Sequence, residues 1–186
     1  LDGATVELSA DELSSFKSAF KGAVLTPQDA GYDETRQIWN AMIDRRPGLI
    51  ARCTGTVDVV QAVRFARKHG LLVSVRGGGH NIAGLAVCEG GLMIDMSLLR
   101  GVWVDPQRRT ARAQAGCTLA DVDRETQLHG LAAVLGFVSA TGIAGRCARA
   151  AIGHAAAAPP NMNMNSRRRM WIAMRPSRRR LCACNR

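Results

Sequence analysis

The chain has 186 residues, of which 47% are apolar and 22% are charged, and its formal net charge is +10. This length fits one or two small domains, and the apolar fraction is sufficient for a real core within the first 145 residues. No run of about 18 or more apolar residues occurs, which excludes a membrane-spanning helix at the level of the sequence.

The first predicted helix begins near the start of the chain. Ser9 followed by Glu12 forms a capping-box pattern. Leu13, Phe16 and Phe20 then form an apolar stripe at helical spacing. We interpret the two phenylalanines as core residues.

A second helical segment is predicted from Tyr32 to about Ile43. Its apolar positions are Ile38, Trp39 and Met42, and we assign it no chemistry. Residues 1–44 are therefore expected to form a helical lead-in to the next domain.

A strand–helix–strand unit is predicted over residues 49–75. Residues 49–53 form the first strand, Thr56 caps a helix over 57–69, Gly70 ends that helix, and residues 71–75 form the second strand. The apolar side of the helix is expected to be buried: Val59, Val60, Val63, Phe65 and Ala66. A right-handed crossover would place the two strands parallel.

Three consecutive glycines follow the second strand, between Arg76 and His80. Gly77, Gly78 and Gly79 lack a Cβ, so their backbone can approach a ligand closely and their N–H groups can converge on anionic oxygens. Arg76 could add charge-assisted hydrogen bonds to a phosphate, and His80 could meet the reactive end of the ligand. The pattern matches neither the Rossmann fingerprint nor a P-loop. A tight turn with a solvated histidine is the alternative interpretation.

Three further strands are predicted after the glycine loop. Residues 91–97 form one strand, and residues 102–105 and 110–116 form two strands around a turn at Pro106. Thr118 then caps a helix predicted over residues 119–129.

This helix is expected to end at Gly130. Asp121 and Asp123 lie in its first turns, where acidic residues suit the helix dipole. We interpret both as solvated helix residues and not as a catalytic pair. Residues 131–136 then lead into a loop over 137–145.

Four segments in this order resemble the FAD-linked oxidases related to vanillyl-alcohol oxidase, p-cresol methylhydroxylase and berberine-bridge enzyme. They are 73–85, 91–97, 102–116 and 131–145, and the resemblance covers about 47–145. It implies an α+β fold, namely a PCMH-type FAD-binding domain in which a small parallel βαβ subdomain adjoins a partly antiparallel subdomain and the flavin lies between them. The domain is expected to be truncated.

In the resembled family, the histidine of the glycine motif bonds covalently to the 8α-methyl group of FAD. The resemblance therefore implies that His80 is the flavinylation site and that the glycine loop holds the pyrophosphate. The implied cofactor contacts lie in the two loops and at the ends of the flanking strands: Arg76, Gly77, Gly78, Gly79, His80, Asn81, Gly84, Leu85, Ser97, Gly116, Val138, Thr141, Gly142, Ile143, Ala144 and Gly145.

One departure from the family pattern concerns a second covalent anchor. Bicovalent members carry a cysteine in the second loop, where this chain has Val138. Valine cannot form a thioether, so attachment through His80 alone is expected. Cys117 is expected to be a small buried residue beside the flavin.

A second departure begins after Gly145, because residues 146–186 hold ten arginines, no lysine and no acidic residue. Residues 1–145 are neutral overall, so this tail carries the whole net charge. Three interpretations compete: a nucleic-acid-binding arm, a metal site, or out-of-frame translation of a GC-rich gene. The metal ligands would come from Cys182 and Cys184, with Cys147 or His154. We favour out-of-frame translation.

Three parts are thus expected: a lead-in over 1–44, an incomplete FAD-binding domain over 45–145 and the tail over 146–186. The resemblance implies an FAD-dependent oxidoreductase that accepts a hydride from a small organic substrate and passes electrons to oxygen. A noncovalent FAD dehydrogenase and a non-catalytic remnant with a nucleic-acid-binding tail are the alternatives. We expect no membrane or nucleic-acid partner and, since the cysteines form no disulfide framework and no signal peptide is apparent, a cytoplasmic location. No catalytic residue is assigned.

Overall fold

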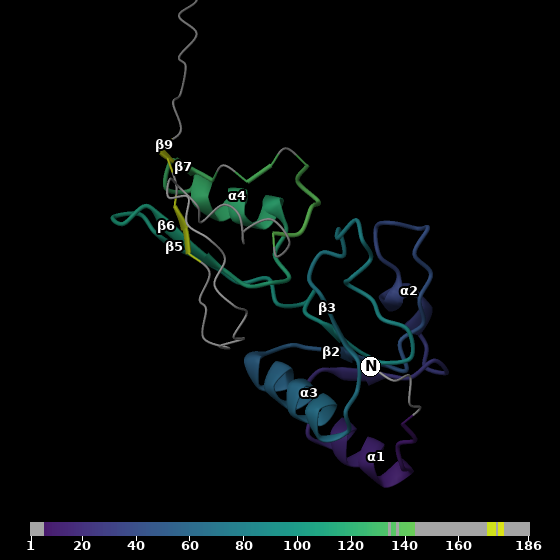
Figure 1. Ribbon diagram of the computed structural model, residues 1–186. Coiled ribbons are helices and arrows are strands. Elements are labelled where there is room, and N and C mark those ends of the chain that lie inside the picture. Colours follow the sequence, from purple (N-terminus) through teal and green to yellow (C-terminus); the bar gives the residue numbers. More distant parts are fainter. Residues whose placement is uncertain (1–5, 134, 137, 144–170, 174, 177–186) are drawn as a thin grey trace, which may run out of the picture.

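The computed structural model describes residues 6–133, 135–136, 138–143, 171–173 and 175–176 (Figure 1). A four-stranded sheet with its helices forms the first unit, and a β-hairpin with one helix forms the second. The expected α+β class, with one mainly parallel and one antiparallel subdomain, is confirmed.

The first sheet has the strand order β1-β2-β4-β3. β1 (Ala23–Leu25) pairs antiparallel with β2 (Leu49–Arg52), and both β2 and β3 (Val73–Arg76) pair parallel with β4 (Leu92–Asp95). The expected parallel arrangement of the two βαβ strands is confirmed, although β4 lies between them. β1 has no counterpart among the elements expected from the sequence.

Helices α1 (Ala10–Ser18) and α3 (Thr56–Lys68) cover one face of this sheet (Figure 1). Alternate residues of β2 and β4 face them, because successive strand residues point to opposite sides. Leu49 and Ala51 pack with Phe16 from α1 in this core. The expected capping box of Ser9 and Glu12 and the burial of Phe16 and Phe20 are confirmed, although α1 ends before Phe20.

The other face of the sheet packs against α2 (Tyr32–Arg36) and the segment around Val87. Ile50 and Met93, which are fully buried, contribute the strand side of this second core. A sheet covered on both faces explains why β4 reads as a continuous apolar run up to Asp95.

Two expectations for α3 are wrong. Its N-cap is Gly55, and no side-chain cap is present at Thr56. Its buried residues include Ala62 and Ala66, whereas Val60 and Val63 are exposed. Of the expected side, Ala66 is buried and Val59 and Phe65 are partly buried against the same core, so the apolar pattern was right in part. The small side chains of Ala62 and Ala66 allow the helix to lie close to the sheet.

The expected helix over 32–43 ends at Arg36, where Gln37 takes an extended conformation. Beyond it the chain bonds to other segments: the Trp39 N–H donates to the Gly79 carbonyl over 3.1 Å, and the Asn40 side chain donates to the Ile82 carbonyl over 3.1 Å. These tertiary hydrogen bonds replace the helical ones and leave Trp39 exposed.

The second unit begins with the expected hairpin of β5 (Val102–Asp105) and β6 (Thr110–Ala113). Helix α4 (Leu119–Gln127) packs on it, and β7 (Leu131–Ala132) follows. Its small core includes Cys117, which is fully buried as expected.

Asp121 of α4 is buried and not solvated as expected. It completes a capping box with Thr118 and receives two hydrogen bonds from Arg100, at 2.9 and 2.8 Å. Burial raises the pKa of Asp121, but the hydrogen bonds from Thr118 and Arg100 outweigh it and hold this pKa below the ordinary value.

Two short strands come from the region of the arginine-rich tail. β8 (Trp171–Ala173) pairs with β6, and β9 (Arg175–Pro176) pairs with β7. The origin of the tail by out-of-frame translation stays a prediction. Its proposed metal ligands lie outside the described residues: Cys147, His154, Cys182 and Cys184.

In the part of the chain that the structure describes, no helix is long and apolar enough to cross a membrane. The same residues contain no cluster of three or more metal-ligating side chains.

Candidate cofactor-binding site

The three glycines lie directly after the carboxyl end of β3, where open α/β sheets bind ligands. Gly79 is buried and takes a φ of +71°, a conformation that favours glycine. No described residue accepts a hydrogen bond from the backbone amides of residues 77–80. The loop therefore presents several unsatisfied N–H donors to an anionic ligand.

The second expected loop meets this first loop backbone to backbone. A Cβ placed on Gly78 would lie 2.5 Å from the Cα of Gly142, and a Cβ on Gly142 would lie 2.6 Å from the Cα of Gly78. Neither position has room for a side chain. The structure thus joins, at one point, two glycines that are far apart in the sequence and belong to the two units.

The second loop is held by the start of α4. Gly142 bridges Thr118, the Leu119 N–H donates to the Thr141 carbonyl over 3.0 Å, and the Ile143 N–H donates to the Cys117 carbonyl over 3.0 Å. Thr141 and Ile143 are buried, whereas Val138 is exposed. The expected contacts Ala144 and Gly145 lie outside the described residues.

His80 is half-buried at the end of the glycine loop. Its Nδ1 lies 2.7 Å from the Gly78 carbonyl oxygen. Because a carbonyl only accepts hydrogen bonds, Nδ1 carries the proton and Nε2 keeps its lone pair in the neutral ring.

Arg76 contacts groups within the fold. Its guanidinium donates to the Thr35 carbonyl and lies 3.8 Å from the Asp95 carboxylate. Its Nε is buried and has no partner among the described residues. The structure thus gives Arg76 a contact that anchors the loop; its expected contact with phosphate stays a prediction.

Asp95 is a buried site residue that the sequence analysis missed. It is fully buried at the carboxyl end of β4, in register with Arg52 of β2 and Arg76 of β3. Its carboxylate lies 3.5 Å from the Arg52 guanidinium and accepts hydrogen bonds from the backbone and hydroxyl of Ser97. The signal was an acidic residue that ends an apolar strand, beside two strands that each end in arginine.

The segment after His80 is held by the lead-in region. The Arg45 guanidinium donates to the carbonyls of Gly84 and Val87, both over 3.1 Å. The Asn81 side chain accepts a hydrogen bond from the backbone of Leu85. This segment of the expected site thus has a fixed path, although Leu85 itself is exposed.

Ser97 and Gly116, two other expected cofactor contacts, are both in contact with the end of β4 or the residues that follow it. The Ser97 hydroxyl donates to Asp95, and a Cβ on Gly116 would lie 2.0 Å from the Met96 carbonyl oxygen. Gly116 thus permits the close contact between the end of β4 and the second unit.

Cys117 lies next to Gly116 but does not offer a reactive thiolate. Burial raises the pKa of its thiol, and its Sγ donates to the Gly101 carbonyl over 3.4 Å. A thiol that stays protonated is a poor nucleophile.

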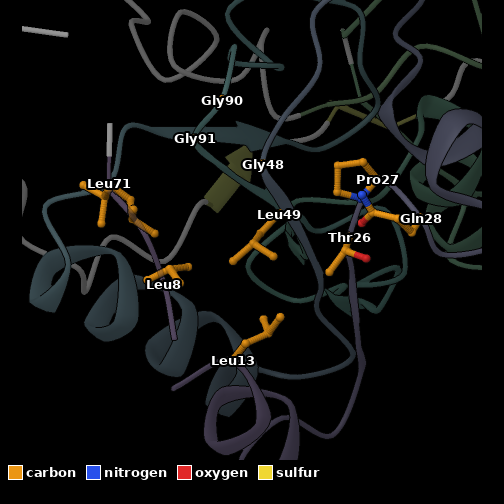
Figure 2. A pocket seen from close by; sticks show the side chains of 11 residues that line it. Leu8, Leu13, Thr26, Pro27, Gln28, Gly48, Leu49, Leu71, Gly90 and Gly91 are labelled. Atoms are coloured by element: carbon orange, nitrogen blue, oxygen red, sulfur yellow. The ribbon is translucent and has the colours of Figure 1, made fainter. Parts of the chain in front are cut away.

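A cavity of about 290 Å³ lies elsewhere, at the amino ends of the parallel strands. Figure 2 shows Leu8, Leu13, Leu49 and Leu71 around it. Its other lining groups include Thr26 and Gln28, and no titratable side chain lines it. This cavity is therefore separate from the glycine loops and their histidine.

Comparison with known proteins identifies a family whose model covers both glycine loops. Residues 47–164 match the family described as FAD binding domain. The (R)-6-hydroxynicotine oxidase of Paenarthrobacter nicotinovorans is 37% identical over 135 residues, which are 73% of this chain and 30% of that protein.

Two solved structures share the fold. The crystal structure of 6-hydroxy-D-nicotine oxidase from Arthrobacter nicotinovorans superposes with a TM-score of 0.66 at 36% identity, over 74% of this chain and 29% of that one. A chitooligosaccharide oxidase superposes with a TM-score of 0.66 at 26% identity, over 73% of this chain and 29% of that one. The chain thus spans about 30% of the length of the relatives that it matches.

Proposed function

The chain belongs to the FAD binding domain family, and from that premise we propose that it is the cofactor-binding part of an oxidase that holds FAD covalently through His80. FAD is the cofactor of this family. The observation that carries the proposal is the contact of Gly78 with Gly142, beside free amides and a histidine whose Nδ1 lies 2.7 Å from the Gly78 carbonyl oxygen. The residues present fit the group, since a glycine cradle with unsatisfied N–H donors suits a pyrophosphate.

The glycine loop would hold the pyrophosphate through the amides of residues 77–80. Thr141 and Gly142 would lie along the other side of the cofactor, and His80 would anchor its ring system. Arg76, Asp95 and Arg45 would act from within the fold, because they keep the glycine loop and the segment after it in place.

When bound, FAD supplies the chemistry by accepting a hydride from the substrate and passing two electrons to an acceptor. We propose oxygen as that acceptor and a small organic molecule as the substrate. The names of the relatives, which include a nicotine oxidase and a chitooligosaccharide oxidase, support a small molecule or an oligosaccharide. We assign no catalytic base to the described residues.

The test is whether flavin stays on the chain after denaturation. The protein would be produced with riboflavin in the medium, denatured in detergent and examined for flavin fluorescence on a gel. The wild-type chain and the His129→Ala variant, which changes an exposed histidine after α4, are expected to fluoresce. The His80→Ala variant is expected to be dark, and fluorescence equal to that of the wild type would overturn the proposed anchor.

A further inference from the structure

We propose that Asp95 is a positioning residue that couples the two glycine loops to each other, an inference that rests on the proposed function. Its carboxylate holds Arg76, which lies against the first loop (77–80). It also holds Ser97, in the turn that supports the second loop (138–143). Asp95 belongs to neither loop, so its effect on a ligand between them is indirect.

Asp95 is a fully buried carboxylate between two arginines. It ends β4 in register with Arg52 of β2 and Arg76 of β3, so the three side chains share one face of the sheet. Its Oδ2 lies 3.5 Å from the Nε of Arg52, and its Oδ1 lies 3.8 Å from the Nη1 of Arg76. A buried charge needs partners of opposite sign, so Asp95 holds both guanidinium groups at this edge of the sheet.

Arg76 extends the effect of Asp95 to the first loop. Its Nε lies 3.4 Å from the position that a Cβ on Gly79 would take, so the guanidinium lies against the loop backbone. The same guanidinium donates to the Thr35 carbonyl, which fixes its direction. Among the described residues, no other carboxylate forms an ion pair with Arg76. Removal of the Asp95 charge would therefore leave a buried cation under Gly79 without a counter-charge.

The turn after β4 extends the effect to the second unit. Asp95 accepts hydrogen bonds from the N–H of Ser97 over 3.1 Å and from its hydroxyl over 3.0 Å. The turn places the Met96 carbonyl oxygen 2.0 Å from the position that a Cβ on Gly116 would take, and the Gly116 N–H donates to the Leu99 carbonyl over 3.0 Å. The second unit thus rests directly on the residues that Asp95 holds.

Gly116 precedes the residue that holds the second loop. The Cys117 carbonyl accepts a hydrogen bond from the Ile143 N–H over 3.0 Å. Gly142, the neighbour of Ile143, meets Gly78 of the first loop. The contacts therefore form a closed path, which runs from Asp95 to each loop and closes where the loops touch. A shift of either loop changes the surroundings of the same carboxylate, which is the physical basis of the coupling.

Asp58 provides a matched control, because it is also a buried aspartate. It accepts hydrogen bonds from the Lys21 N–H over 2.9 Å and from the N–H and hydroxyl of Thr54, both over 2.8 Å. These partners belong to the segments before β1 and before α3, and not to either glycine loop. The Asp58→Asn variant therefore removes a buried charge without changing the path through Asp95.

The first readout needs no ligand and follows one hydrogen-bonded amide at each loop by hydrogen–deuterium exchange in NMR. The Trp39 N–H, which donates to the Gly79 carbonyl, reports on the first loop, and the Ile143 N–H reports on the second. Rates are compared after correction for global unfolding, which the amides of β4 report. We expect both amides to exchange about tenfold faster or more in Asp95→Asn, and neither to change in Asp58→Asn.

A milder variant keeps the test decisive if Asp95→Asn does not fold. Ser97→Ala removes only the hydroxyl that donates to Asp95 and leaves the ion pair with Arg76 in place. We expect faster exchange of the Ile143 amide in this variant, by about threefold or more, and an unchanged rate for the Trp39 amide.

The second readout is the affinity for ADP, which carries a pyrophosphate but no flavin. We expect Asp95→Asn to raise the Kd for ADP by about tenfold or more, because both loops lose their pre-organisation, and Asp58→Asn to leave it unchanged. Gly142→Ala separates the loops at their contact and weakens binding as well. The two losses are expected to be non-additive, with the double variant within about threefold of the weaker single variant.

The outcomes separate the coupling from the proposed function. An unchanged Ile143 amide in both Asp95→Asn and Ser97→Ala overturns the coupling, and so do additive losses of ADP affinity in the double variant. A wild-type chain that shows the expected exchange pattern but binds neither ADP nor FAD overturns the proposed function, whereas the coupling of the loops is supported.

Discussion

At the scale of single residues, the contact of Gly78 with Gly142 gives the clearest prediction. A Cβ at Gly78 would meet backbone atoms of Gly142 at 2.5 and 2.7 Å, so the two loops must separate in a Gly78→Ala variant. We expect its affinity for FAD to fall about tenfold or more, which corresponds to about 1.4 kcal/mol or more. Flavin fluorescence quenching on titration of the apo chain measures this change.

The control for that prediction is Gly55→Ala. A Cβ at Gly55 meets nothing within 4 Å, and its φ of −158° is open to any residue. This variant weakens the N-cap of α3 by about 1 kcal/mol at most and is expected to keep the wild-type affinity for FAD. If the Gly78→Ala variant and the wild type bind FAD with equal affinity, the proposal that the two glycine loops hold the cofactor is contradicted.

The sequence predicted the glycines and His80 because their chemistry is local: backbone freedom and a nucleophile lie within a few consecutive residues. It did not predict the contacts of Trp39, Asn40 or Asp95, which depend on residues far apart in the chain. Asp95 pairs with Arg52 and Arg76 only because the strand order places both arginines beside it. The spacing of apolar residues in the sequence does not reveal the order of the strands.

At the scale of elements, the junction of α4 with the loop between β4 and β5 depends on Asp121. We expect Asp121→Asn to lower the free energy of unfolding by about 1–3 kcal/mol at neutral pH, because it weakens the capping box and the hydrogen bonds from Arg100. Denaturant unfolding followed by circular dichroism measures this loss, and Asp123→Asn on the same helix is expected to change stability by less than about 0.5 kcal/mol.

The effect of Asp121 on stability has a defined pH dependence. Its pKa is lower in the folded chain than the ordinary value of 3.8, so its stabilising contribution is complete well above that pH. The contribution is lost as pH falls below 3.8 toward the folded pKa. The stability gap between wild type and Asp121→Asn should therefore narrow in acid, and a gap that widens there would contradict this account.

The sequence predicted the start of a helix correctly where a side-chain cap fixes it. Ser9 with Glu12 and Thr118 mark the starts of α1 and α4 in the sequence and in the structure, and α4 ends at Gln127, shortly before Gly130. The predicted end of α2 was wrong, because hydrogen bonds to the glycine loop stop that helix at Arg36. The local sequence carries no signal for this end. On the predicted buried side of α3, only Val60 and Val63 were wrong, because Ala62 and Ala66 make the close contact with the sheet.

At the scale of the whole molecule, the two units are expected to respond to FAD together. Their contact at Gly78 and Gly142 brings one loop from each unit together, where we propose that the cofactor binds. Hydrogen–deuterium exchange should therefore show protection by FAD in residues 77–85 and 138–143 together, with α1 unchanged. Protection confined to one of the two loops would contradict the placement of the cofactor between the units.

The arginine-rich region leads to a prediction about the gene. If residues 146–186 result from out-of-frame translation, resequencing from the codon for Leu131 onward should show that a shifted frame restores a glycine-rich turn. A frame that is intact through the codon for Arg186 would contradict this, and the ten arginines would then need a role of their own.

The central claim is that the chain holds FAD through His80, and peptide mapping tests it most directly. Trypsin cleaves after Arg76 and Arg100, which releases residues 77–100 as one peptide. We predict that this peptide carries the added mass of FAD and that fragmentation places it on His80. A flavin mass on the peptide over residues 113–124, which contains Cys117, or an unmodified chain after expression with abundant riboflavin, would contradict the account.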